Sequence, residues 1–117
     1  MNDITKKITE MIVVAAEDKK ATDVLTFDVE GVSAVTDAFV ICSAKSTTQV
    51  QAIADHIEEE LKKKGIEMLH QEGHKAGRWI LLDFNHCIVH VFVEEEREFY
   101  NLERLLDKTQ PREMEAE

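Results

Sequence analysis

The sequence lacks any hydrophobic run of the roughly 18 residues that a membrane-spanning helix needs. Its first residues, MNDITKKITEMI, alternate between acidic and basic side chains and have no long apolar stretch behind a positive start, unlike a secretory signal peptide. We therefore expect a cytoplasmic protein with no membrane partner. A length of 117 residues predicts a single domain, and the sequence shows no internal repeat.

Cysteine is scarce as well. Only Cys42 and Cys87 are present, each inside an apolar, strand-like segment. Such residues in a reducing compartment are typical buried free thiols, and a disulfide between them is the less favoured alternative.

Basic residues are few compared with acidic ones. The chain has 14 Lys and Arg against 24 Asp and Glu, a formal net charge of -10. Nucleic-acid binding depends on cationic side chains that displace counterions, so direct contact with nucleic acid is not expected as the main interaction. The charge favours a basic partner, although solubility alone also explains it.

The patterns of metal and phosphate sites are missing. The sequence has no C-x-x-C, H-E-x-x-H, G-x-x-x-x-G-K or G-x-G-x-x-G motif, and no D-x-D pair on one strand. We therefore expect no metal and no cofactor. The segment Lys45–Thr48 precedes a helix, where weak anion binding is an alternative to ordinary capping.

Hydrophobic periodicity predicts the first half of the fold. Apolar residues at helical spacing predict a helix over 3–19. Segments 24–29 and 38–44 have strand composition, and the continuous apolar run of the second predicts a strand covered on both faces. Ser46 and Gln49 form a capping pattern ahead of an amphipathic stripe, which predicts a second helix.

The second half of the chain is richer in strands. We predict a strand at 66–70, a loop at 71–77, a hairpin of strands 78–84 and 87–93 turned by Asn85-His86, and a helix beginning near Glu94. We predict that the strands at 38–44 and 66–70 are parallel and that the second helix joins them in a right-handed crossover.

The resulting order, α-β-β-α-β-β-β-α, predicts an α/β (α+β) protein with a mixed sheet of about five strands flanked by helices. The domain is expected to span 1–107. Residues 108–117 contain the only proline and no apolar pattern, so a disordered acidic tail is expected there.

Both faces of the predicted hairpin are largely apolar. Three helices have difficulty covering both sides of five strands, so some aromatic side chains are expected to stay partly exposed. The candidates are Trp79, Phe84, Phe92 and Tyr100. An exposed aromatic patch rimmed by charge is typical of a protein-binding site, and burial of the patch under a helix is the alternative.

The sequence resembles the ribosomal silencing factor family, also called the Iojap-like family, over about residues 4 to 107. Three blocks carry the resemblance in the right order: TDAFVICSAKSTTQVQAIADHI, then EG with WILLDF and VHVF, then REFYNLERL. Two positions differ from the family pattern. Asn85-His86 stands where the family usually has Gly-Asp, and Leu105-Leu106 where it often has Leu-Trp.

The resemblance implies a nucleotidyltransferase-like topology without that activity. It implies a translational repressor that binds the large ribosomal subunit through its ribosomal protein fourteen and sterically blocks joining of the small subunit when nutrients are scarce. It implies no enzymatic reaction, and the lack of paired carboxylates agrees with this independently.

We hypothesise that the contact with this partner is made by Trp79, Phe84 and Tyr100. A supporting network of hydrogen bonds and ion pairs, fixing the hairpin on the last helix, is expected from Asp83, His90, Arg97 and Glu103.

Two alternatives stay open. One is a degenerate nucleotidyltransferase-like enzyme or nucleotide-binding domain that uses Asp37, Asp83 and the loop Lys45–Thr48. The other is a homodimer that buries the apolar face of the hairpin.

Overall fold

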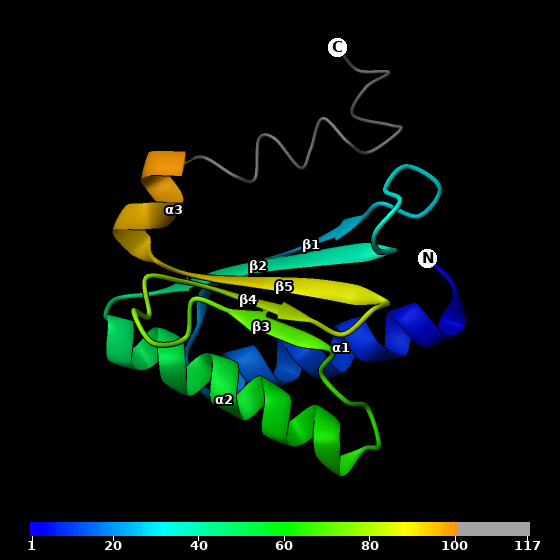
Figure 1. Cartoon of the computed structure of the whole chain (residues 1–117), viewed down its shortest axis with the longest axis horizontal. Coiled ribbons are helices and arrows are strands. Elements are labelled where there is room, and N and C mark those ends of the chain that lie inside the picture. Colours follow the sequence, from blue (N-terminus) through cyan, green and yellow to red (C-terminus); the bar gives the residue numbers. More distant parts are fainter. Residues whose placement is uncertain (101–117) are drawn as a thin grey trace.

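The computed structural model describes the backbone of residues 1–100 and the side chains of residues 1–97. Glu103, Leu105-Leu106 and the predicted tail at 108–117 lie outside the described residues, and so does the side chain of Tyr100. The predicted order of helices and strands is confirmed (Figure 1).

Apart from β3, the bounds of the elements lie close to the predicted ones. They are α1 (Asp3–Asp18), β1 (Thr22–Asp28), β2 (Ala38–Ala44), α2 (Thr47–Lys63), β3 (His70–Glu72), β4 (Trp79–Asp83), β5 (Cys87–Val93) and α3 (Glu94–Tyr100). Asn85, in the turn between β4 and β5, has a φ of 73°, a left-handed conformation that asparagine tolerates.

One strand is displaced from its predicted position. Residues 66–69 form no strand, and β3 lies instead at His70–Glu72, inside the segment expected to be mostly a loop. It pairs with β4 at one edge of the sheet, so it is not a neighbour of β2. Following the pairings, β3 still runs in the same direction as β2, because both are reached from β5 through an even number of antiparallel steps.

The five strands form one mixed sheet in the order β1-β2-β5-β4-β3. Its centre is the parallel pair β2 and β5, with Ala38 opposite Cys87 and Ala44 opposite Val93. The other three pairings are antiparallel. The outer strand β1 carries a bulge between Thr22 and Leu25, where Asp23 has a φ of 49°.

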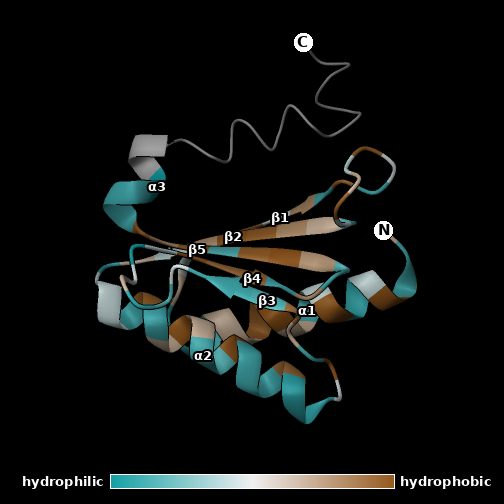
Figure 2. Cartoon of the chain, in the orientation of Figure 1, coloured by the Kyte–Doolittle hydropathy of each residue, from teal (hydrophilic) through white to brown (hydrophobic). Residues whose placement is uncertain are grey.

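Helices α1 and α2 pack side by side on one face of the sheet (Figure 1). They bury the main core, to which the strands contribute alternate residues. The strand residues are Ala38, Val40, Cys42, Ala44, Ile80, Leu82, Cys87, Val89, Val91 and Val93. Burying one large aliphatic side chain contributes about 1.5–3 kcal/mol, so this layer is the principal source of stability. Figure 2 shows the apolar sides of both helices turned toward the sheet.

Side-chain caps fix where the two long helices begin. Asn2 accepts a hydrogen bond from the backbone N–H of Thr5 at 2.8 Å. Ser46 accepts one from Gln49 at 3.1 Å, and the Gln49 side chain reaches back to the N–H of Lys45 at 3.2 Å. The predicted capping pattern is therefore confirmed, and it places α2 directly after β2.

Both cysteines are free and buried, as predicted. Burial raises the pKa of each thiol to about 12. The thiolate is the nucleophilic form, so neither residue is activated for chemistry. None of the described helices is both long and apolar enough to cross a membrane.

Gly73 allows the loop after β3 to lie directly against the first residue of β4. Its φ is +80°, and a Cβ at this position would overlap the carbonyl oxygen of Trp79. Gly65 has a nearly identical φ of +81° but has open space around it. The two glycines therefore separate the effect of backbone conformation from the effect of close packing.

We predict that Gly73→Ala lowers the free energy of unfolding by roughly 3 kcal/mol or more, because strain and overlap add. Gly65→Ala, the matched control, is expected to cost only about 1 kcal/mol from backbone strain. Urea denaturation of both variants measures the difference. Equal losses would contradict the close packing of Gly73 on Trp79.

Candidate functional site

Aromatic side chains meet on the face of the sheet that α1 and α2 do not cover. The strand registers place Trp79 opposite Phe92, and Leu81 opposite His90. The parallel pairing of β2 with β5 places Phe39 opposite Ile88, which lies two residues before His90 on the same strand. Because residues two apart on a strand share a face, these side chains form one continuous surface. We call the four rings Phe39, Trp79, His90 and Phe92 the aromatic face.

The rings of the aromatic face are in mutual contact. Trp79 stacks on Phe92 with ring centroids 4.8 Å apart and an interplanar angle of 29°. His90 lies 5.6 Å from Phe39 and 6.1 Å from Phe92. These spacings lie in the favourable range for aromatic pairs, so each ring restricts the motion of its neighbours.

His90 occupies the middle of this surface in its neutral form. The indole Nε1 of Trp79 donates a hydrogen bond to Nδ1 of His90 at 3.1 Å. The acceptor nitrogen carries no proton, so the imidazole holds its proton on Nε2. Burial lowers the pKa of His90 from 6.5 to about 4, which keeps the ring uncharged at neutral pH.

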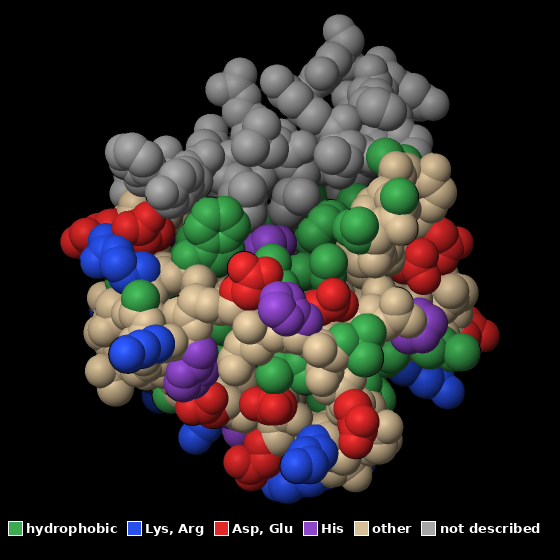
Figure 3. Space-filling model, in the orientation of Figure 1, with side chains coloured by type: hydrophobic (Ala, Val, Ile, Leu, Met, Phe, Trp, Pro, Cys, Tyr) green, Lys and Arg blue, Asp and Glu red, His purple; other side chains and the backbone are tan. Residues whose placement is uncertain are grey.

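The aromatic face is layered. Phe92 is fully buried and His90 is 7% exposed. The lower layer consists of these two residues and the buried cluster that contains Phe92, namely Phe27, Val29 and Ile41. Phe39 and Trp79 are only partly buried and pack on that layer. Figure 3 shows hydrophobic side chains gathered on the upper part of the described surface, with acidic and basic groups to the left and acidic groups to the right. The exposed part of the site is therefore a small apolar patch with a charged rim.

The structure corrects the expectation that Phe84 is exposed for partner binding. Phe84 is 2% exposed and belongs to the core under α1 and α2. Strand alternation puts it on the same face as Ile80 and Leu82, opposite to Trp79. The residue that sequence reasoning missed is Phe39, whose ring lies on the aromatic face because it alternates with the buried Ala38 and Val40.

The described residues of the predicted supporting network make their hydrogen bonds at three places. Asp83 accepts a hydrogen bond from the N–H of Asn85 at 2.8 Å and fixes the hairpin turn. His90 holds Trp79. Arg97 donates to the Ser43 hydroxyl at 3.1 Å and to the Asp23 carbonyl. Ser43 and Asp83 lie opposite β5 residues that are four positions apart, roughly 13 Å along the strand. Glu103 and the side chain of Tyr100 lie outside the described residues.

The first turn of α3 is tied to the sheet beside Trp79. Arg78, the residue before Trp79, pairs with Glu96 at 2.7 Å. Arg97 is 6% exposed, and its hydrogen bonds to β1 and β2 offset the cost of burying a charge. The helix start is thereby held at one end of the aromatic face.

The groups of the candidate enzyme site are not brought together. Asp37 and Asp83 lie at the end of the sheet where β2 begins, whereas Lys45–Thr48 follows the last residue of β2. Seven strand residues separate these positions, roughly 20 Å or more. Asp37 accepts a hydrogen bond from Thr5 at 3.3 Å, and Ser46 caps α2. Among the described residues, no group of three or more histidine, cysteine or acidic side chains is arranged to hold a metal ion.

Comparisons with known proteins agree on one family. The family model described as "Ribosomal silencing factor during starvation" matches residues 2–117. The ribosomal silencing factor RsfS of Bacillus subtilis is 44% identical over 100 residues, covering 86% of this chain and 85% of that protein. The chloroplastic protein Iojap of Zea mays is 33% identical, covering 86% of this chain and 43% of that protein. A crystal structure of a Chromobacterium violaceum protein superimposes with a TM-score of 0.85 at 28% identity, covering 91% of this chain and 87% of that one.

The buried His90 predicts a specific dependence of stability on pH. The unfolded chain binds a proton at this ring below pH 6.5, whereas the folded chain does so only near pH 4. The free energy of unfolding that depends on neutral His90 is therefore fully present above pH 6.5. It falls by up to about 3 kcal/mol as the pH decreases toward 4. Urea denaturation at several pH values measures this loss.

The matched control is His90→Asn, which keeps an oxygen acceptor near the position of Nδ1 but does not titrate. Subtracting its pH profile removes the contribution of the carboxylates, and the remaining slope should lie between pH 6.5 and 4. A His90 ring that titrates at or above pH 6.5 by NMR would rule out its burial in neutral form.

Proposed function

The chain belongs to the ribosomal silencing factor family, and on this premise we propose that it is a cytoplasmic translational repressor acting by occupancy alone. It binds the large ribosomal subunit through that subunit's ribosomal protein fourteen and blocks joining of the small subunit. The partner and the blocked step are what the family resemblance implies. The single observation in this chain that supports them is the aromatic face, a partly exposed apolar surface held rigid by its own contacts.

Rigidity is what makes this surface suited to binding. Trp79 is fixed by stacking on Phe92 and by its hydrogen bond to His90, so little side-chain entropy is lost when a partner covers it. Tryptophan is also the residue most often found to dominate the binding energy of interfaces. The proposed contact is centred on Trp79 and Phe39, with Leu81 and Asp83 beside them on the same face.

The charge of the chain selects the kind of ribosomal surface. A net charge of -10 repels the phosphate backbone of ribosomal RNA, whereas a basic ribosomal protein attracts it. The rim of the aromatic face carries both signs, with Arg78 paired to Glu96 and Asp83 at the far end of β4. An apolar centre with a charged rim is suited to a protein partner, and RNA is not its main contact.

The mechanism needs no reaction. A folded domain of this size, held where the small subunit must approach, prevents joining by excluded volume. Repression then depends on affinity and concentration, and the candidate catalytic groups play no part. The separation of Asp37 and Asp83 from Lys45–Thr48 supports this reading over a nucleotidyltransferase.

A titration with ATP and Mg²⁺ separates the two readings. We expect isothermal calorimetry to show no saturable heat, because the acidic and basic groups lie at opposite ends of β2. A saturable signal that disappears in Asp37→Asn would favour the nucleotide-binding alternative.

Trp79→Ala is predicted to weaken binding to isolated large subunits by about 2 kcal/mol or more, or roughly 30-fold. Phe39→Ala should weaken it in the same direction. Leu69→Ala is the matched control, because Leu69 is also a large exposed hydrophobic residue but lies outside the aromatic face. A pull-down of large subunits quantifies the three variants, with circular dichroism to confirm folding. Wild-type binding by a folded Trp79→Ala protein would exclude the aromatic face as the contact.

Sucrose-gradient sedimentation tests the blocked step itself. Added protein should travel with free large subunits and reduce the amount of joined ribosomes as its concentration rises. Protein that travels with large subunits while joining proceeds unchanged would leave binding intact and contradict the steric block.

Self-association through the aromatic face is a competing use of the same surface. Such a homodimer would cover Trp79 and Phe39, so dimerisation and ribosome binding would exclude each other. In that case Trp79→Ala would abolish both the dimer and the binding of large subunits.

A further inference from the structure

The outer surface of α1 carries a second apolar stripe that faces away from the sheet. Ile4 and Val14 are 61% and 59% exposed, and Met11 between them is only partly buried. With Lys7 and Asp18 they follow alternating steps of three and four residues, the spacing of a helix surface that packs against another helix. The buried residues of α1 form a different stripe, so this one is not part of the core.

Two hollows flank this stripe. The larger one lies between α1 and α2, has a volume of about 500 Å³, and has Met11, Val14 and Ala15 as its apolar floor. We call it the α1–α2 groove. The smaller one, of about 310 Å³, lies between α1 and Thr26 of β1. Val14 lines both hollows and is therefore a ridge between them. A small molecule would fill one hollow, whereas a ridge beside grooves is the shape against which a helix packs.

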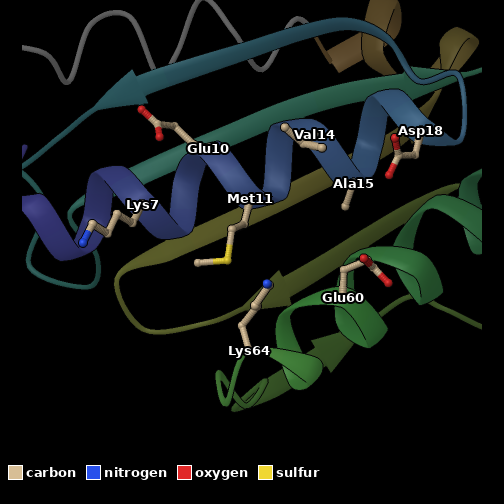
Figure 4. A pocket seen from close by; sticks show the side chains of 8 residues that line it. All are labelled: Lys7, Glu10, Met11, Val14, Ala15, Asp18, Glu60 and Lys64. Atoms are coloured by element: carbon tan, nitrogen blue, oxygen red, sulfur yellow. The ribbon is translucent and has the colours of Figure 1, made fainter.

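The charges along the α1–α2 groove are sorted by sign. Lys7 and Lys64 lie toward one end, and Asp18 and Glu60 lie toward the other (Figure 4). Glu10, the remaining charged residue of the lining, points away from α2. The groove therefore has a basic end, an apolar middle and an acidic end.

We propose that an amphipathic helix of another protein docks in the α1–α2 groove. Its apolar stripe covers Met11 and Val14. Acidic side chains in its first turn face the basic end of the groove, and basic side chains in its last turn face the acidic end. Lys7 and Asp18 are eleven residues apart, roughly 16 Å along a helix, so about three turns of the partner span the groove.

The backbone chemistry of the groove favours a helix over an extended segment. An extended segment laid on Met11 and Val14 would place its N–H and C=O groups against apolar side chains. The helices α1 and α2 offer it no hydrogen bonds there, because their own backbone groups are bonded within each helix. A docked helix satisfies its backbone internally and presents only side chains to the groove.

The sorted charges also set the direction of the docked helix. Negative side chains stabilise the first turn of a helix and positive ones the last turn. A helix with this charge order fits with its first turn over Lys7, parallel to α1. The dipoles of α1 and α2 oppose each other, since Gln49, near the start of α2, bonds to the carbonyls of Lys19 and Lys20 just after α1. A uniformly acidic or basic partner would meet one end of the groove unfavourably.

The groove stays accessible when the aromatic face is covered, because α1 and α2 lie on the opposite side of the sheet (Figure 1). The chain thus has room for a ribosomal partner on one side and a helical partner on the other. The helix-docking proposal does not depend on the function proposed above.

Two synthetic peptides of about 14 residues test the groove. Both carry leucines at helical spacing. The acid-first peptide has glutamates in its first turn and lysines in its last, and the base-first peptide has these turns exchanged. We expect the full chain to bind the acid-first peptide about tenfold more tightly in fluorescence anisotropy at low salt, because the four charges of the groove ends attract one peptide and repel the other.

Exchanging the charges of α1 gives the sharpest result. In Lys7→Glu/Asp18→Lys, two of the four groove charges favour each peptide, so the ratio of the two affinities is expected to fall about tenfold. A difference in helicity between the peptides does not affect this comparison, because both proteins meet the same pair. Glu17→Lys/Lys19→Glu is the matched control, since these residues are exposed and line neither hollow.

The apolar middle is tested separately. Val14→Asp is expected to weaken binding of the acid-first peptide by about tenfold or more, because it puts a charge on the apolar ridge. Val35→Asp is the matched control, since Val35 is 68% exposed and lines neither hollow. Circular dichroism confirms that each variant is folded.

The location of the bound peptide is read by NMR. Trp79 is the only tryptophan of the chain, so its indole N–H gives a single signal from the aromatic face. The acid-first peptide should shift backbone signals of α1 and α2 and leave the indole signal unchanged. Trp79→Ala should bind this peptide like the wild type.

Four results would overturn the proposal. They are the absence of saturable binding by either peptide, an affinity ratio that is the same in the wild type and in Lys7→Glu/Asp18→Lys, Val14→Asp binding like the wild type, and a peptide that shifts the Trp79 indole signal. A change in the sedimentation of the protein alone in Val14→Asp would assign the groove to a second copy of the chain and would likewise exclude a helical partner there.

Discussion

The hydrogen bond from the Trp79 indole to His90 is the interaction on which the aromatic face depends. It requires an unprotonated Nδ1, and burial supplies this by holding the pKa of His90 near 4. It also uses the only polar atom of Trp79, so the ring is oriented before any partner arrives. The hydrogen bond between Trp79 and His90 thus fixes the shape of the aromatic face, although the exposed part of that face is apolar. The surface depends in turn on the central position of β5, which carries both His90 and Phe92.

Much of the fold could be predicted because its signals are local. The apolar run at 38–44 is β2 to the residue, and the Ser46–Gln49 pattern marks the start of α2. Strand β3 was misplaced because His70–Glu72 is short and polar, and only its pairing with β4 makes it a strand. The segment 66–69 is more apolar than β3 itself, and its composition is therefore more typical of a strand.

The candidate site was harder to predict, because it depends on which face of the sheet the helices cover. Alternation correctly separates Phe84 from Trp79, but it does not say which of the two faces the core. Phe39 was overlooked for the same reason. Arg97 contacts Asp23, 74 positions away in the sequence, and no local pattern predicts such a contact. The described members of the predicted network have separate partners, because Asp83 bonds to Asn85 in the turn, His90 to Trp79 across the hairpin, and Arg97 to Ser43 and Asp23.

The bulge in β1 has a consequence for how copies of this protein avoid uncontrolled association. An outer strand offers unpaired N–H and C=O groups, which invite another strand to extend the sheet into aggregates. Here the irregularity between Thr22 and Leu25 breaks the regular ladder, and Asp23 gives its carbonyl oxygen to Arg97 of the same chain. An incoming strand would find its template interrupted at this bulge. The bulge therefore limits the length of regular outer strand to which another chain could pair.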